Sequence, residues 1–443
     1  MIFESWQGSL ADVNELVATA YEAEREGRWK DAATLWREVV WRSPDHVDRG
    51  AFCASYGRAI LECGEKVRAV NLLSRLAKLY PDRAECSSSL ALAFSRSDAH
   101  DRSGPVWTQV LSKFPNNPNR RWWLPSAAHS WLELGQLDLA EQACQEAMSE
   151  FPDSPWGFAM LSVVSERRFQ WDLALEMVVR ALGVCSARER SGFVVSKLRV
   201  LSEMGRVETV KEILEQELGC DPGNAPLLIA ASYSVSIQGP MSEAEEWWER
   251  CVSTCPDTPD AYIGKASLLR ATGQATAAEK ILRQCCERWP QQPALWRALA
   301  ETCSYLRNME CARQAWNEAS RIAPLSIFRL WGQCAFLGSI GARQEAEDLL
   351  ASSNAVGSVL WRGRFEYAKA ARELDASITC LEELRKTSPT VATLAHAEAE
   401  VRSWRKADDD LETAAHILQA QLDVSPSGVR SAELLVRVLV LLG

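Results

Sequence analysis

The residues that could carry out catalysis are few and scattered in this 443-residue chain. Its five histidines are spread over separate stretches, at positions 46, 100, 129, 396 and 416. The sequence contains no G-x-x-x-x-G-K-[ST], no G-x-G-x-x-G after a strand, no H-E-x-x-H and no G-x-S-x-G. Carboxylates are plentiful, but on amphipathic helices a carboxylate run is usually a solvated face. We therefore predict no catalytic site, no cofactor and no enzyme activity.

The fourteen cysteines are the other chemically active group. Cys251 and Cys255 are spaced i, i+4, and Cys285 and Cys286 are adjacent, but neither pair is a C-x-x-C and no histidine lies nearby. A long chain without a secretory signal is expected to keep its thiols reduced. We interpret the cysteines as small apolar core residues and predict no metal site.

Charge and hydropathy exclude several classes of partner. The net charge is −10 and the isoelectric point is about 5.3, with basic residues scattered among carboxylates, so nucleic acid is not an expected partner. The first residues, MIFESWQGSLADVNEL, lack the basic and apolar regions of a signal peptide. The most apolar stretch, LLVRVLVLLG at the end, is short and contains Arg437. We expect a cytoplasmic protein that does not insert into membranes.

Binding chemistry is concentrated in NPNRRWWLPSAAHSW, residues 117–131, and an internal repeat must position it. A glycine is followed by alanine five residues later and proline seventeen residues later, most clearly at Gly135 and Gly273. The closing prolines at 222, 256, 290 and 324 are 34 residues apart. A fixed period of this length predicts an array of similar units.

Each repeat has the hydrophobic period of two helices with a break at the glycine. Within residues 293–324, one face of the first helix carries Trp296, Leu299, Ala300 and Cys303, and the second helix carries Ala312, Trp316 and Ala319. This segment resembles the tetratricopeptide repeat (TPR), whose pattern is W-x-x-L-G-x-x-Y, then A-x-x-x-F, then P. Alanine replaces the glycine and cysteine replaces the tyrosine.

The resemblance implies an all-α fold, a right-handed superhelical solenoid. We expect eleven or twelve TPR-like hairpins between about residues 13 and 427, then a C-terminal capping helix near 428–442. Small side chains let paired helices approach closely, and large ones fill the space between neighbours. The small set is Ala32, Ala140, Ala278 and Ala312, and the large set is Trp36, Trp107, Trp248 and Trp316.

Three stretches interrupt the repeat and suggest the domain organisation. Residues 97–106 place Gly104-Pro105 where a second helix should begin, and residues 183–192 and 352–358 lack the closing proline. We predict a main solenoid over residues 1–354, with irregular joints near 97–106 and 183–192. Residues 355–443 are predicted to hold degenerate repeats and the capping helix.

In the resembled family the first helix of each hairpin lines a concave surface, where exposed side chains hold peptides. Tryptophan and arginine are frequent anchors at interfaces. Trp122 and Trp156 are one period apart, so we expect neighbouring indoles in the groove, although both could instead be core. Trp123 and Leu124 are predicted to pack on the preceding repeat, with Arg120 and Arg121 at the rim. The candidate ligand-binding residues are Trp122, Trp156, His129, Arg167, Arg199, Tyr233, Arg270, Arg297, Tyr305 and Trp331.

Two known groove chemistries of the family do not fit. The places on the first helices where a carboxylate clamp has lysine and asparagine hold alanine, serine, arginine or aromatic residues instead, and the positions of an asparagine ladder hold no asparagine. We therefore predict a non-catalytic scaffold or adaptor that binds a protein or peptide partner in its groove. The alternatives are an accessory subunit of an enzyme complex, such as a glycan- or group-transfer system, and a structural protein that self-assembles. A homo-oligomer formed through the C-terminal repeats is possible, because the apolar end could be a buried cap or an assembly face.

Overall fold

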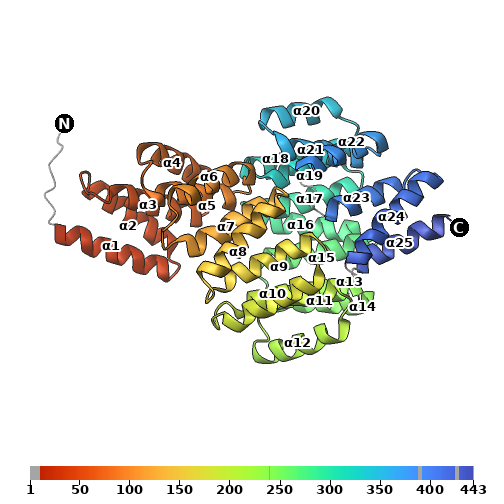
Figure 1. Ribbon diagram of the computed structural model, residues 1–443, viewed down its shortest axis with the longest axis horizontal. Helices are drawn as coiled ribbons and strands as arrows, with labels where there is room; N and C mark the ends of the chain where they lie inside the picture. Colours follow the sequence, from red (N-terminus) through yellow and green to blue (C-terminus); the bar gives the residue numbers. More distant parts are fainter. Residues whose placement is uncertain (1–9, 239, 388–391, 425–428, 443) are drawn as a thin grey trace. The chain divides into compact units, whose positions relative to one another are not determined.

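The computed structural model describes residues 10–238, 240–387, 392–424 and 429–442. The described residues form twenty-five α-helices and no strand, which confirms the predicted all-α class (Figure 1). They divide into two compact units, Met1–Glu133 and Leu134–Gly443. This division differs from the boundary predicted near residue 354. None of the described helices is both long enough and apolar enough to span a membrane.

The first unit contains three helical hairpins followed by a single helix. Its helices are α1 (Leu10–Arg25), α2 (Trp29–Arg42), α3 (Arg49–Glu62), α4 (Lys66–Leu79), α5 (Ala84–Arg96), α6 (His100–Lys113) and α7 (Arg120–Glu133). The predicted interruption at 97–106 leaves the hairpin intact, because α6 begins at His100 and continues through Gly104 and Pro105. The turn before it uses Asp98 at φ 55°, where the two preceding hairpins use Gly27 and Gly64.

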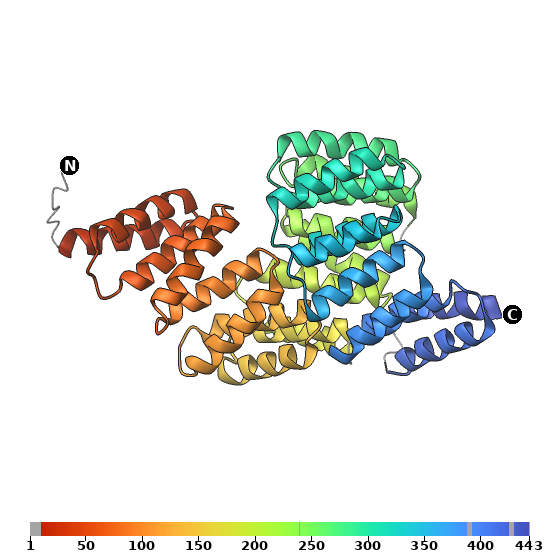
Figure 2. The same cartoon turned by 90° about the horizontal axis from the view of Figure 1, so that it is seen from above.

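The second unit begins with one helix, continues with eight hairpins and ends with α25. Its helices are α8 (Leu137–Glu150), α9 (Pro155–Arg167), α10 (Trp171–Val184), α11 (Arg190–Glu203), α12 (Val207–Cys220), α13 (Ala225–Gln238), α14 (Met241–Thr254), α15 (Pro259–Ala271), α16 (Ala275–Arg288), α17 (Pro293–Tyr305), α18 (Met309–Ile322), α19 (Ile327–Ser339), α20 (Arg343–Ser352), α21 (Gly357–Ala370), α22 (Leu374–Thr387), α23 (Ala392–Arg402), α24 (Asp408–Val424) and α25 (Val429–Leu442). Figure 2 shows successive hairpins of this unit stacked side by side. The predicted number of hairpins and the final helix are confirmed.

The recurring glycines and prolines of the repeat are explained by two different structural requirements. Gly27, Gly64, Gly135, Gly205, Gly273 and Gly341 all have positive φ between 71° and 88°, in the turn that ends a first helix. A side chain there would bring its Cβ too close to the backbone, so glycine is favoured. Pro155, Pro259 and Pro293 occupy the first turn of α9, α15 and α17, where a missing N–H costs no helical hydrogen bond.

The core of each unit lies between hairpins as well as within them. Trp36, Trp107, Trp248 and Trp316 are at most 2% exposed, as predicted for residues that fill the space between neighbours. The Trp248 indole N–H donates to Ser236 Oγ at 3.0 Å, and Trp36 donates to Glu24 Oε1 at 2.8 Å. The indole of Trp248 also lies against Gly264 in the next hairpin. Because these rings bridge neighbours, no hairpin completes its core alone.

Polar contacts on the surface repeat with the same period. Lys113 Nζ donates to Pro81 O at 2.9 Å and to Asp82 at 2.8 Å, and Arg288 binds Pro256 O and Asp257 in the same way. In both cases a basic residue holds the Pro-Asp corner of the preceding hairpin. Exposed ion pairs contribute only about 0–1 kcal/mol each, so these contacts set the spacing of hairpins more than they stabilise them.

Two contacts join early and late parts of the second unit. The Phe169 ring, in the turn between α9 and α10, lies 6.1 Å from the His396 ring on α23. Leu134 packs against the core cluster formed by residues 266–367. Phe169 has φ 58°, a conformation unusual for a bulky side chain, and its ring also stacks on Trp171. The contact of Phe169 with His396 therefore places α23 beside the turn of the first hairpin of the same unit.

The C-terminal helix α25 is both a cap and an exposed surface. Leu434, Leu435 and Val438 are buried against α24 and α23. Val436 and Val440 on the other side are 61% and 74% exposed. Of the two roles left open by the sequence, the cap is present, while self-assembly through the exposed side stays a prediction.

Candidate functional site

The first helices of the second unit form one layer, which positions most of the candidate binding residues. Each first helix in this part of the unit contacts the next first helix along the chain, in the order α11, α13, α15, α17, α19 and α21. Side chains that point away from the second helices are therefore brought onto a shared surface. This arrangement follows from the hairpin period, because equivalent positions recur every 34 residues.

The structure brings several of the predicted residues together on α13, α15 and α17. The Tyr233 side chain is 44% exposed, and its ring meets the edge of Trp248 at 4.9 Å. Partial burial raises the pKa of the Tyr233 phenol, the negative charge of Asp260 raises it further, and the positive charge of Arg297 lowers it. Those charges come from α15 and α17, so three successive first helices meet here.

Arg270 and Arg297 share one carboxylate on the same surface. Arg270 Nη1 lies 3.5 Å from Glu301 Oε2, and Arg297 Nε lies 3.8 Å from Glu301 Oε1. Both pairs are long and partly exposed, so they contribute little to stability. Tyr305, at the end of α17, is 59% exposed. We call the set Tyr233, Arg270, Arg297 and Tyr305 the first-helix surface.

Other predicted residues are already engaged within the protein. Arg199 forms a two-point ion pair with Glu166, with both N–O distances 2.9 Å. Trp156 is half-buried and its ring meets the edge of Phe193 at 5.3 Å. Arg167 is also half-buried. Arg199 and Trp156 thus join α9 to α11, which leaves less of their surface for a ligand.

Trp331 is likewise held by its neighbours. Its indole N–H donates to Val359 O at 3.1 Å, and its ring meets Phe328 edge-on at 5.6 Å. The Arg362 guanidinium lies 5.9 Å from the ring centre. Since its indole N–H is bonded to Val359 and its ring lies near Arg362, Trp331 connects α19 to α21.

In the first unit, Trp122 is the most exposed tryptophan among the predicted residues, at 53%. His129 is exposed and its ring lies 5.2 Å from that of buried His100. Trp123 and Leu124 are buried, as predicted. Trp122 and Trp156 belong to different units, so their expected proximity stays a prediction.

The predicted position of Arg120 at the groove rim is wrong. Arg120 is only 4% exposed, and its Nη1 donates to Leu111 O at 3.3 Å. The long side chain reaches back to the end of α6, where the last carbonyls of a helix lack intrahelical donors. Arg121 is half-buried.

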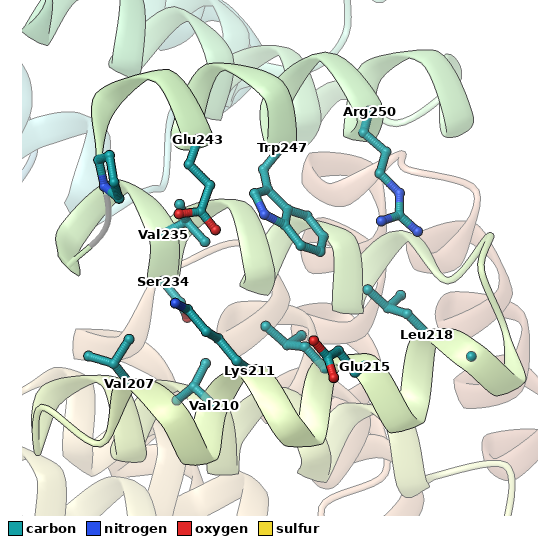
Figure 3. A pocket seen from close by; sticks show the side chains of 13 residues that line it. Val207, Val210, Lys211, Glu215, Leu218, Ser234, Val235, Glu243, Trp247 and Arg250 are labelled. Atoms are coloured by element: carbon teal, nitrogen blue, oxygen red, sulfur yellow. The ribbon is translucent and has the colours of Figure 1, made fainter.

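A groove that the sequence did not indicate lies between the second helices α12 and α14, with α13 as its floor (Figure 3). Its volume is about 700 Å³. Figure 3 shows Val207, Val210 and Leu218 on α12 facing Trp247 on α14. The charged groups of the lining are Lys211, Glu215, Glu243 and Arg250. Apolar walls bordered by both signs of charge are suited to part of an amphipathic segment.

One sequence feature could have indicated this groove. The doublet Trp247-Trp248 lies on one helix, where adjacent residues point about 100° apart. Trp248 fills the core position and is 1% exposed, so Trp247 had to lie elsewhere. It lies half-buried in the groove with the Arg250 guanidinium 5.1 Å from its ring centre. The width of the groove depends on how far apart α12 and α14 lie, which the repeat pattern does not specify.

Comparison with known proteins supports the hairpin interpretation. The tetratricopeptide repeat family model matches residues 259–302, which span α15, α16 and most of α17. No curated protein matches the chain. Three solved structures resemble it at low similarity. The APC/C hetero-tetramer Cut9-Hcn1 has 15% identity, a TM-score of 0.37 and 96% of each chain covered.

The other two structures are similarly distant. Yeast Tom70 has 11% identity and a TM-score of 0.38, with 97% of this chain and 96% of that chain covered. A tetratricopeptide repeat protein from Parabacteroides merdae ATCC 43184 has 12% identity and a TM-score of 0.42, with 66% and 98% covered. At these values no partner or activity can be transferred from them.

Proposed function

We propose that this chain of stacked helical hairpins, of which residues 259–302 match the tetratricopeptide repeat model, is a non-catalytic scaffold that binds an extended segment of a partner protein on its first-helix surface. The observation that carries this proposal is the exposure of Tyr233 on α13 and of Arg297 and Tyr305 on α17, two helices of the same layer. Aromatic and arginine side chains are the commonest strong contributors at interfaces. Helices hold them in fixed positions, so binding orders few groups.

The charges of the surface favour a segment with both an apolar and an acidic residue. Arg270 and Arg297 compete for the single carboxylate of Glu301, at 3.5 and 3.8 Å. An acidic side chain from a partner would give one guanidinium a closer, charge-assisted hydrogen bond. Tyr305 offers an exposed ring for an apolar or aromatic neighbour of that acid.

We also propose a cytoplasmic location, because of the state of the cysteines. All fourteen cysteines are free, and most are buried thiols. Burial raises the pKa of Cys251 and Cys285 to about 11, so these thiols stay protonated near neutral pH. A reducing compartment suits a chain with this many unpaired thiols.

Affinity purification with matched variants tests the proposal. The full chain is used as bait beside Tyr233→Ala/Arg297→Ala/Tyr305→Ala and a control, Val179→Ala/Arg321→Ala, in which exposed residues of second helices α10 and α18 are changed. We expect one or more proteins retained by wild type and control and depleted at least tenfold by the triple variant, with unchanged circular dichroism. Equal capture by all three baits would refute a role for the first-helix surface.

The identity of the retained protein separates the remaining alternatives. A partner with transferase activity that falls when this chain is removed would favour an accessory subunit. Recovery of only further copies of the chain would favour self-assembly, in which case deleting residues 429–443 should abolish it.

A further inference from the structure

Three side chains with metal-binding atoms meet at the junction of α16, α17 and α18. They are Glu279, Cys303 and Cys311, and their ligand atoms all lie within 4.8 Å of one another. Cys303 is fully buried and Cys311 is 8% exposed. The sequence hides the cluster, because the three residues belong to different helices and no motif spacing connects them.

The separation of Cys303 and Glu279 is close to that of two ligands of a tetrahedral ion, and the other ligand atoms lie within 4.8 Å. Cys303 Sγ lies 3.9 Å from Glu279 Oε1. In a tetrahedral zinc site, bonds of about 2.3 Å to sulfur and about 2.0 Å to oxygen place neighbouring ligand atoms about 3.5–3.8 Å apart. Side-chain rotations that shorten these separations by up to about 1 Å would therefore place the three ligand atoms at three corners of a tetrahedron.

The repeat position of Cys303 is a further observation. It stands at the position where the tetratricopeptide pattern has tyrosine, so a much larger side chain has been replaced by a thiol. Cysteine can be buried without a ligand. Replacement of the tyrosine by cysteine would therefore by itself indicate only a smaller core residue. A second thiol and a carboxylate lie at the same place, so the three groups together could bind one metal ion.

Arg283 completes the charge balance. Its Nη2 donates to Cys311 Sγ at 2.9 Å and to Glu279 Oε1 at 2.7 Å. Two thiolates and one carboxylate would carry three negative charges, so a divalent ion leaves one, which the guanidinium neutralises. Hydrogen bonds of this kind to ligand atoms orient them and tune the affinity of metal sites.

From this geometry we propose that Glu279, Cys303 and Cys311 bind one zinc ion, with Arg283 as a positioning residue and the fourth coordination place open to water. Thiolate ligands favour zinc over magnesium or calcium. Binding releases the two thiol protons to solvent, and no oxidation or reduction is involved. The ion would join three helices from two successive hairpins.

Metal titration of the full chain tests this proposal. The protein is stripped with a chelator under reducing conditions and titrated with Co²⁺ and then with Zn²⁺. We expect one equivalent of Co²⁺ with a thiolate-to-cobalt absorption band, displaced by Zn²⁺, and an increase in melting temperature with Zn²⁺. Absence of a tightly bound equivalent, or binding without a thiolate band, would overturn the proposal.

A matched pair of variants identifies the ligands. Cys303→Ser/Cys311→Ser should lose the band, whereas Cys251→Ser/Cys255→Ser should keep it, because those cysteines have the same exposures of 0% and 8% on α14 and at its end. Glu279→Gln and Arg283→Gln keep both thiols and should weaken Zn²⁺ binding, Arg283→Gln by about 10–100-fold. If the first double variant unfolds, Glu279→Gln decides: unchanged affinity would contradict the site.

Discussion

Replacing Gly264 with alanine tests how hairpins share their core. A Cβ at Gly264 would lie 2.5 Å from Cζ2 of Trp248 and closer still to two other atoms of the same ring. The indole cannot easily move away, because its N–H is bonded to Ser236 and its ring packs nearly perpendicular to that of Tyr233. Overpacking of a rigid core typically costs about 1–3 kcal/mol, and we expect the upper half of that range.

The assay is urea unfolding of the second unit within the full chain, with hydrogen exchange to locate the loss. Gly219→Ala is the control, since it lies in helix α12 with no atom within 4 Å of a new Cβ. Alanine there should stabilise by about 0.5–1 kcal/mol, because glycine is unfavourable inside a helix. We expect protection to fall in α14 and α15 for Gly264→Ala. Equal stability of wild type and Gly264→Ala would refute the close packing of Trp248 against the next hairpin.

The remaining predictions concern single contacts. Trp122→Ala should cost less than about 1 kcal/mol and Trp123→Ala about 3–5 kcal/mol, as measured by urea unfolding, because they are 53% and 7% exposed. Burial, with a smaller effect of His129, lowers the pKa of His100 to about 3 from its ordinary 6.5, so the unfolded chain gains a proton first as the pH falls. The contribution of neutral His100 to the free energy of unfolding is therefore complete above about pH 6.5 and is lost toward pH 3, with about 3 kcal/mol lost at pH 4.5. The free energy of unfolding of His100→Gln should depend less on pH than that of wild type. The same pH dependence in both proteins would contradict the burial of a neutral His100. Phe169→Leu and His396→Leu should show a coupling energy of about 0.5–1.5 kcal/mol in a double-mutant cycle, and zero coupling would mean that α23 does not pack on the α9–α10 turn.

The sequence predicts the hairpins well because the signals that define them are local. Gly135 and Gly273 occupy turns at positive φ, and Trp36 and Trp316 are buried at the predicted positions. These features depend on the period and on side-chain size, both of which can be read from the chain. The hand of the superhelix is implied only by the family resemblance and stays a prediction.

The site could be predicted only in part, because it depends on distances between hairpins. Arg120 was placed wrongly because its side chain is long enough to reach Leu111 O at the end of α6. The groove beside Trp247 depends on the separation of α12 and α14. The cluster of Glu279 and two cysteines combines residues from three helices, so it becomes visible only when the hairpins are stacked.

Photo-crosslinking shows most directly whether a partner occupies the first-helix surface. A photoreactive amino acid would replace Tyr305, which is 59% exposed on first helix α17, or Val179, which is 47% exposed on second helix α10. Crosslinks from position 305 to a defined segment of the partner, with few or none from position 179, are expected. Crosslinks from position 179 alone would contradict the proposed binding surface.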